Sequence, residues 1–158
     1  MYSFRSLREK DFPVLLEWLS RPHVKEWWDD GDDTLEKVAA HYSADPDETR
    51  RFLLFRQTHE VQTAVVPVGY FQYYMQPRGV VGIDQFLAER TLLNQGIGTL
   101  VIRQFIELIK ARENPRCIIV DPELRNRRAI RCYEKMGFRY VGIIKRAEGT
   151  LCMMRLDL

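Results

Sequence analysis

Hydrophobic and polar residues follow two different periods along this chain of 158 residues. Alternation with a period of two is typical of half-buried strands, and short apolar runs between turn residues are typical of fully buried ones. The two patterns predict strands over the following stretches: Tyr2–Arg8, Arg51–Gln57, Ala64–Met75, Val80–Leu87, Cys117–Val120, Phe138–Lys145 and Leu151–Leu156.

Apolar residues at helical spacing separate these strands. Asp11 is suited to cap a first helix that has Pro13 in its first turn. Thr34 is suited to cap another, and Gly137 is a plausible left-handed C-cap for the last. The predicted helices are a first one through Leu19, a short one over Pro22–Trp28, one from Thr34 to about Tyr42, one over Leu100–Lys110 and one over Asn126–Met136.

The resulting order is β-α-α-β-β-β-α-β-α-β-β, with one short extra helix near the front. Hairpins combined with a β-α-β crossover predict an α/β domain with a mixed sheet. No repeat, linker or low-complexity segment interrupts the chain, so we expect a single domain over residues 1–158.

Composition excludes several classes of function. A net charge of +2 is too small to indicate nucleic-acid binding, and no apolar run is long enough to span a bilayer. The first ten residues lack the uninterrupted apolar core of a signal peptide. Cys117, Cys132 and Cys152 have no metal-ligand spacing, and we expect them to be buried reduced thiols. We therefore expect a cytoplasmic protein with no metal, nucleic-acid partner or membrane partner.

A glycine-bearing turn between a predicted strand and a predicted helix is the strongest local signal. It has the sequence Asn94-Gln95-Gly96-Ile97-Gly98-Thr99. Free backbone N–H groups at a helix start bind phosphate, helped by the helix dipole, and glycine allows a ligand to come close to the backbone. By itself Gly-x-Gly is a weak motif, because a tight strand-to-helix turn gives the same pattern.

A second stretch makes the turn more informative. It has the sequence Asn126-Arg127-Arg128-Ala129-Ile130-Arg131-Cys132-Tyr133-Glu134-Lys135-Met136-Gly137-Phe138. Together the two stretches resemble the coenzyme A site of the GNAT acyltransferase superfamily. The resemblance implies a mostly antiparallel mixed sheet flanked by helices, a β-α-β coenzyme-binding core, and acetyl-CoA as cofactor. The cofactor-binding residues that it implies are Phe86, Leu87, Ala88, Asn94, Gln95, Gly96, Ile97, Gly98, Thr99, Asn126, Ala129 and Tyr133.

A closer resemblance, covering nearly the whole chain, is to the aminoglycoside 6′-N-acetyltransferases. It rests on Trp27-Trp28 and its surroundings, on Gly82-Ile83-Asp84-Gln85, and on Ala129-Ile130-Arg131-Cys132-Tyr133-Glu134-Lys135. The resemblance implies that Trp27 and Trp28 wall the acceptor site and that Asp121 binds amino groups. It also implies that Asp84 contacts the reacting amine, and we expect Asp84 to be catalytic and Gln85 to bind the substrate beside it. Tyr133 would protonate the departing thiolate.

Each of these roles has an alternative. Asp84 could instead be a bulge residue bonded to backbone, and Tyr133 a core aromatic. The acidic loop at Asp29–Asp33 could be a substrate rim or a solvated loop. Cys132 is about 100° from Tyr133 on an ideal helix, which argues against a covalent cysteine route.

One departure from the aminoglycoside enzymes leaves the acceptor open. Those enzymes carry a long acidic insertion between the third and fourth strands, where this chain has only Gln76-Pro77-Arg78-Gly79. We therefore expect transfer of an acetyl group to a primary amine of a small cationic acceptor, by a monomer or homodimer. The alternatives are a GNAT enzyme acting on a siderophore precursor or a protein amine, and a coenzyme-A-binding module without turnover.

Overall fold

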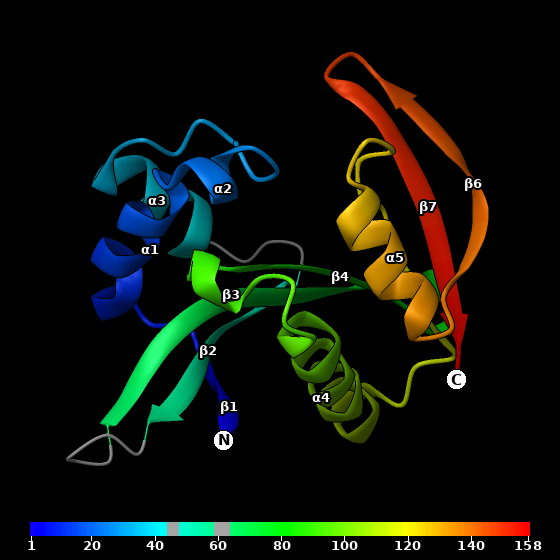
Figure 1. Cartoon of the computed structure of the whole chain (residues 1–158), viewed down its shortest axis with the longest axis horizontal. Helices are drawn as coiled ribbons and strands as arrows, with labels where there is room; N and C mark the ends of the chain where they lie inside the picture. The colour runs from blue at the N-terminus through cyan, green and yellow to red at the C-terminus, as the bar shows by residue number, and fades with distance from the viewer. Residues whose placement is uncertain (44–47, 59–63) are drawn as a thin grey trace. The chain divides into compact units, whose positions relative to one another are not determined.

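A computed structural model describes residues 1–43, 48–58 and 64–158 of the chain (Figure 1). Seven strands form a largely antiparallel sheet in the order β1-β2-β3-β4-β5-β7-β6. The order of strands and helices and the mixed α/β class agree with the sequence prediction. The main elements are β1 (Tyr2–Ser6), α1 (Phe12–Leu19), α2 (Pro22–Lys25), α3 (Leu35–Ser43), β2 (Arg50–Thr58), β3 (Ala64–Gln76), β4 (Val80–Leu87), α4 (Ile97–Glu113), β5 (Cys117–Val120), α5 (Arg127–Lys135), β6 (Arg139–Arg146) and β7 (Gly149–Asp157).

The chain divides into two compact units, which are described separately. The N-terminal unit comprises Met1–Tyr73 and Gln85–Leu92, and the C-terminal unit comprises Tyr74–Asp84 and Leu93–Leu158. Strands β3 and β4 each contribute to both units, since the division falls within them.

The N-terminal unit has its core between α1, α3 and the strands. Leu15, Trp18, Val38, Leu53 and Tyr70 are at most 2% exposed and belong to one hydrophobic cluster. Complete burial of such side chains contributes about 1.5–3 kcal/mol each. The helices supply one apolar face each, so the cluster explains why the helical spacing in the sequence is a reliable signal here.

The C-terminal unit is built around a crossover. Strands β4 and β5 run parallel and pair at Val80–Gly82 with Cys117–Ile119. Parallel neighbours need a long connection, and α4 provides it. Strand β7 pairs antiparallel with β5 and with β6, and in Figure 1 the β6–β7 hairpin is the orange and red pair at the end of the chain.

Some local predictions differ from the structure. Asp11 precedes α1 without capping it by a side-chain bond. Its carboxylate instead accepts hydrogen bonds from the Arg8 backbone N–H at 2.9 Å and the Arg5 guanidinium at 2.8 Å. The hydrogen bond from the Arg8 N–H to Asp11 closes a turn just after β1. Residue Arg8 is therefore part of this turn, and the strand ends at Ser6.

The predicted cap of the third helix agrees with the structure, whereas the ends of two other helices differ. The Thr34 hydroxyl accepts from the Lys37 backbone N–H at 3.2 Å, as a cap does. Helix α2 ends at Lys25, before Trp28, and α4 extends beyond the predicted stretch at both ends. The polar connection after α3 and the turn between β2 and β3 lie partly outside the described residues. Within the described ranges, no helix is long and apolar enough to cross a membrane.

Candidate active site

The glycine turn, defined as Asn94–Thr99, leads directly into α4. Gly96 occupies the N-cap position with φ 77°, a left-handed conformation that glycine adopts without strain, and no side chain caps the helix. A Cβ at Gly96 would meet no atom within 4 Å, so the backbone is open on that side. The helix has 17 residues and an aligned dipole. Uncapped N–H groups beside an open glycine form a site suited to phosphate.

Helix α5 carries Tyr133. Asn126 begins the helix as its N-cap, and its side chain accepts from the Ala129 backbone N–H at 3.2 Å. The Tyr133 side chain is 7% exposed, and its ring packs on that of Phe138 with centroids 5.3 Å apart. The spacing of Asn126, Ala129 and Tyr133 places them on one face of the helix, and each of them is partly or completely buried.

The start of α4 is tied to α5 by a side-chain contact. The Thr99 hydroxyl and the Cys132 thiol are 3.3 Å apart. Cys132 is half-buried, whereas Cys117 and Cys152 are buried. This contact places the Cys132 thiol beside Thr99, the last residue of the glycine turn. That Cys132 is not a catalytic nucleophile stays a prediction.

The same unit contains a group of interacting charged and titratable side chains that we call the tyrosine–carboxylate cluster: Tyr74, Asp84, Asp121 and Arg146. Burial raises the pKa of Tyr74, and the negative charges of Asp84 and Asp121 raise it further. The Tyr74 ring lies over Gly82, two residues before Asp84, where any Cβ would overlap the ring. The phenol therefore remains protonated at neutral pH and can donate a hydrogen bond.

Asp121 follows β5 directly, as the sequence predicted. Burial raises the pKa of its carboxyl group, and the Arg146 guanidinium opposes that rise. The Arg146 Nη2 atom lies 4.0 Å from Asp121 Oδ2. Asp84 and Asp121 are thus both within electrostatic range of Tyr74, although 37 positions separate them in the sequence.

Sequence reasoning missed Tyr74 and Arg146. Tyr74 lies in an apolar strand with several other aromatic residues, and Arg146 lies near a turn with other basic residues. The one available signal for Tyr74 was Gly82, because a glycine within a strand often marks a close approach by another group.

Strand β4 carries Asp84, and its backbone beyond Gly82 is expected to bind the pantetheine arm of the coenzyme. Over the described residues, β5 pairs with β4 only as far as Gly82. Of the residues expected to bind pantetheine, Phe86 packs its ring on Tyr70 and Trp28 at 5.6 and 5.3 Å. Ala88 is 0% exposed, its N–H donates to Val68, and its carbonyl accepts from Arg21. The N–H and the carbonyl of Ala88 are therefore already engaged, whereas binding of pantetheine by Phe86 and Leu87 stays a prediction.

The N-terminal unit contains the tryptophans. The Trp28 indole N–H donates to the Tyr42 hydroxyl at 3.2 Å, and its ring packs edge-on against Tyr70 and Phe86. Burial raises the pKa of Tyr42, so this hydroxyl stays protonated. Trp28 is therefore held in one orientation, whereas Trp27 is half-buried after the end of α2.

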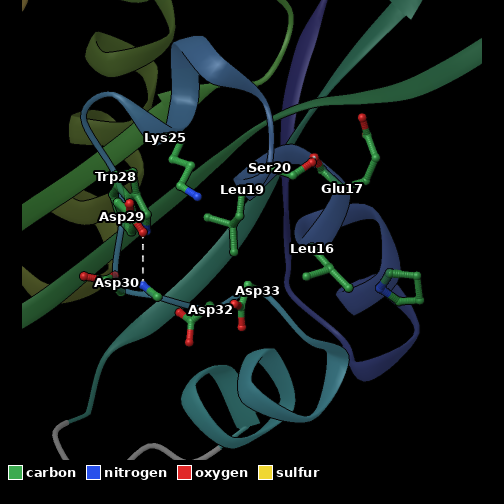
Figure 2. A pocket seen from close by; sticks show the side chains of 12 residues that line it. Leu16, Glu17, Leu19, Ser20, Lys25, Trp28, Asp29, Asp30, Asp32 and Asp33 are labelled. Carbon is green, nitrogen blue, oxygen red and sulfur yellow. Dashed lines mark hydrogen bonds between the residues drawn. The ribbon is translucent and has the colours of Figure 1, made fainter.

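A pocket of about 330 Å³ lies beside Trp28 and the acidic loop (Figure 2). Its carboxylates are Glu17, Asp29, Asp30, Asp32 and Asp33, and Lys25 also lines it. Several of these acids have partners: Asp33 pairs with Lys37 at 2.6 Å and Asp32 with His41 at 2.6 Å. Burial raises the pKa of Asp30, and the charges of Asp32 and Asp29 add to that effect. The loop is therefore both a pocket wall and a partly neutralised surface.

The expected site residues thus fall into two groups. Asp84, Asp121, the glycine turn, Asn126, Ala129 and Tyr133 belong to the C-terminal unit, and Trp27, Trp28, Gln85, Phe86, Leu87 and Ala88 belong to the N-terminal unit.

Comparisons with known proteins concern the family and the fold of the chain. The family model described as "Acetyltransferase (GNAT) domain" matches residues 8–146. The chain is 32% identical to an aminoglycoside N(6′)-acetyltransferase type 1 of Klebsiella pneumoniae, covering 96% of this chain and 81% of the relative. It is 24% identical to the lysine N-acyltransferase MbtK of Mycolicibacterium paratuberculosis, covering 99% and 73%.

Solved structures of an aminoglycoside acetyltransferase are also similar to this chain. The structure of AAC(6′)-Ib in complex with paromomycin and acetyl-CoA has a TM-score of 0.83 and 32% identity, over 99% of this chain and 93% of that one. The complex of the same enzyme with coenzyme A and kanamycin also has a TM-score of 0.83, over 99% and 95%.

Proposed function

The chain belongs to the GNAT acetyltransferase family, and from that premise we propose that it transfers the acetyl group of acetyl-CoA to a primary amine of a small cationic acceptor, as aminoglycoside 6′-N-acetyltransferases do. The family match spans both compact units, which supports the view that residues 1–158 form one catalytic domain. The observation that carries the proposal is the tyrosine–carboxylate cluster, because two acids and a phenol near one another are suited to a protonated amine.

The glycine turn is proposed to hold the coenzyme pyrophosphate on the N–H groups at the start of α4. Its fit rests on the uncapped helix end and the open side of Gly96. The pantetheine amides would pair with β4 backbone at Phe86 and Leu87 by strand addition. Bound there, acetyl-CoA supplies a thioester that an amine can attack.

Asp84 and Tyr133 are proposed to handle the protons. A primary amine is mostly protonated at neutral pH, so the Asp84 carboxylate first attracts the ammonium group and then takes its proton, directly or through water. A backbone N–H of β4 stabilises the developing oxyanion. The Tyr133 hydroxyl then donates its proton to the departing thiolate. Asp121 and the hydroxyl of Tyr74 bind the acceptor, and Trp27 and Trp28 wall it.

A second acceptor class has one specific observation in its favour. The link between β3 and β4 is a tight turn at Pro77–Gly79, where the resemblance to the aminoglycoside enzymes would imply a long acidic insertion. Fewer carboxylates then hold the outer rings of a large polycation. A smaller amine, such as the side chain of a lysine-like acceptor, fits that observation, as does the similarity to a lysine N-acyltransferase.

The test is a panel of amines offered with acetyl-CoA while free thiol release is followed. Kanamycin, spermidine, free lysine and a lysine-containing peptide cover the candidate classes. The proposal predicts thiol release with at least one of the small cationic amines. Release with the peptide alone would contradict it, and so would the absence of release with every acceptor by a protein that binds acetyl-CoA.

A further inference from the structure

Arg146 occupies a position that the acetylation reaction does not require. Its guanidinium is near Asp121, the carboxylate proposed to bind an amino group of the acceptor. It also contributes a positive charge at Tyr74, so it belongs electrostatically to the tyrosine–carboxylate cluster. An arginine here places a permanent cation where a cationic acceptor must bind.

The backbone holds Arg146 in this neighbourhood. Arg146 ends β6 and pairs with Gly149 across a two-residue turn. Strand β7 is in turn fastened to the segment that follows Asp121: the Cys152 N–H donates to the Pro122 carbonyl at 2.8 Å, and the Leu124 N–H donates to the Thr150 carbonyl at 2.8 Å. The hairpin end and the Asp121 segment are therefore parts of one hydrogen-bonded frame.

The neighbouring arginine, Arg125, is engaged elsewhere, because its Nε donates to Glu123 at 2.7 Å. The Arg146 side chain is 57% exposed and that of Asp121 is 26% exposed. An ion pair at this separation and exposure is weak, so a stronger competitor for Asp121 can displace the guanidinium.

We infer that Arg146 is a specificity-determining residue, which occupies the cation position of Asp121 and selects against acceptors that carry a second ammonium group. An acceptor with one ammonium group can use Asp84 and leave the pair intact. A polycation must displace Arg146 from Asp121 and then tolerate its positive charge nearby. The inference rests on the proposed function, since it assumes that the acceptor binds at this cluster.

The test measures equilibrium binding, so that it does not depend on turnover. Spermidine, a polycation, and benzylamine, a monocation, are titrated calorimetrically into the coenzyme-A-loaded protein. The substitution Arg146→Gln should tighten spermidine binding about three- to fivefold, the effect of removing one exposed charge, and leave benzylamine binding unchanged. Higher salt should reduce the difference by screening.

The matched control is Lys145→Gln, which removes the same charge from the adjacent, exposed position of β6, opposite Thr150. It should leave the spermidine affinity near the wild-type value. In an Asp121→Asn background, Arg146→Gln should lose most of its effect. Equal gains from Arg146→Gln and Lys145→Gln would reduce the effect to net charge and overturn the inference, as would unchanged spermidine affinity.

The amine panel separates this inference from the proposed function. Thiol release with small amines, combined with no effect of Arg146→Gln on spermidine binding, overturns the inference alone. Absence of release with all amines overturns the proposed function.

Discussion

The glycine turn and the tyrosine–carboxylate cluster lie in the same unit but use different parts of the chain. The glycine turn offers backbone N–H groups of consecutive residues, fixed by the start of α4. The cluster offers side chains from β3, β4, the end of β5 and the end of β6. Backbone groups carry no titratable charge and are suited to the phosphates of a coenzyme that every reaction shares, which is the role we propose for the glycine turn. Side chains from separate elements can vary one by one, so they are suited to setting the acceptor.

The largest expected effect is that of Tyr133→Phe. Removal of the proton donor should lower the turnover number by about 10²–10⁴-fold and leave the KM for acetyl-CoA nearly unchanged. Tyr140→Phe is the control, because Tyr140 is 60% exposed on β6. The check is steady-state kinetics with both substrates varied. Equal activity of the two variants would make Tyr133 a packing residue.

The glycine turn is tested most cleanly at Gly98. A Cβ there would lie 3.9 Å from the Cys132 sulfur, an ordinary contact, so Gly98→Ala should fold normally. Its methyl group should hinder the approach of the pyrophosphate and raise the KM for acetyl-CoA about tenfold or more, the value of one charged hydrogen bond.

Gly96 is a less suitable position for this test. Its φ of 77° imposes a strain of about 1–2 kcal/mol on any other residue, so weaker coenzyme binding by Gly96→Ala would have two causes. Thermal unfolding of both variants separates them. A Gly98→Ala protein with the wild-type melting temperature and wild-type coenzyme affinity would mean that the phosphate binds elsewhere.

The alkylation rate of Cys132 should report directly on coenzyme binding at the glycine turn. Its thiol contacts Thr99 of the glycine turn, so bound acetyl-CoA should shield it. Alkylation by iodoacetamide should slow about tenfold at an acetyl-CoA concentration about ten times its Kd, because only free protein reacts. Cys117 and Cys152, which are 1% and 4% exposed, serve as internal controls in the same mass-spectrometric measurement. Unchanged alkylation of Cys132 at saturating coenzyme would contradict this placement.

The smallest effect concerns pH. Burial raises the pKa of Asp121, so its carboxylate takes up a proton at a higher pH than an ordinary aspartate does. As pH falls through that raised value, the negative charge is lost and the KM for a cationic acceptor should increase. The KM for acetyl-CoA should change less over the same range, because backbone N–H groups do not titrate there. Parallel changes in both constants would erase the distinction between the two regions.

The same distinction explains what the sequence predicted. The glycine turn, the β4–α4 crossover and the helix that carries Tyr133 are local patterns, readable from glycine positions and apolar spacing. Arg146 gave no such signal and Tyr74 only the indirect one of Gly82, because their proposed roles depend on contacts with Asp121 and Gly82 that form only after folding. Asp11 shows the same limit on a smaller scale. The sequence predicted that it caps α1, but its carboxylate accepts hydrogen bonds from Arg5 and from the Arg8 N–H instead.

The most direct test of the account is a paired measurement on Asp84→Asn. Acetyl-CoA binding is measured by calorimetry, and acetyl transfer to the best amine of the panel is measured by thiol release. We predict an unchanged coenzyme Kd and a turnover lowered by about 10²-fold or more, because the substitution removes the proton acceptor but leaves the glycine turn intact. Turnover within a few fold of wild type would contradict the assignment of Asp84. Loss of coenzyme binding in a folded variant would contradict the separation of coenzyme and acceptor sites on which the account rests.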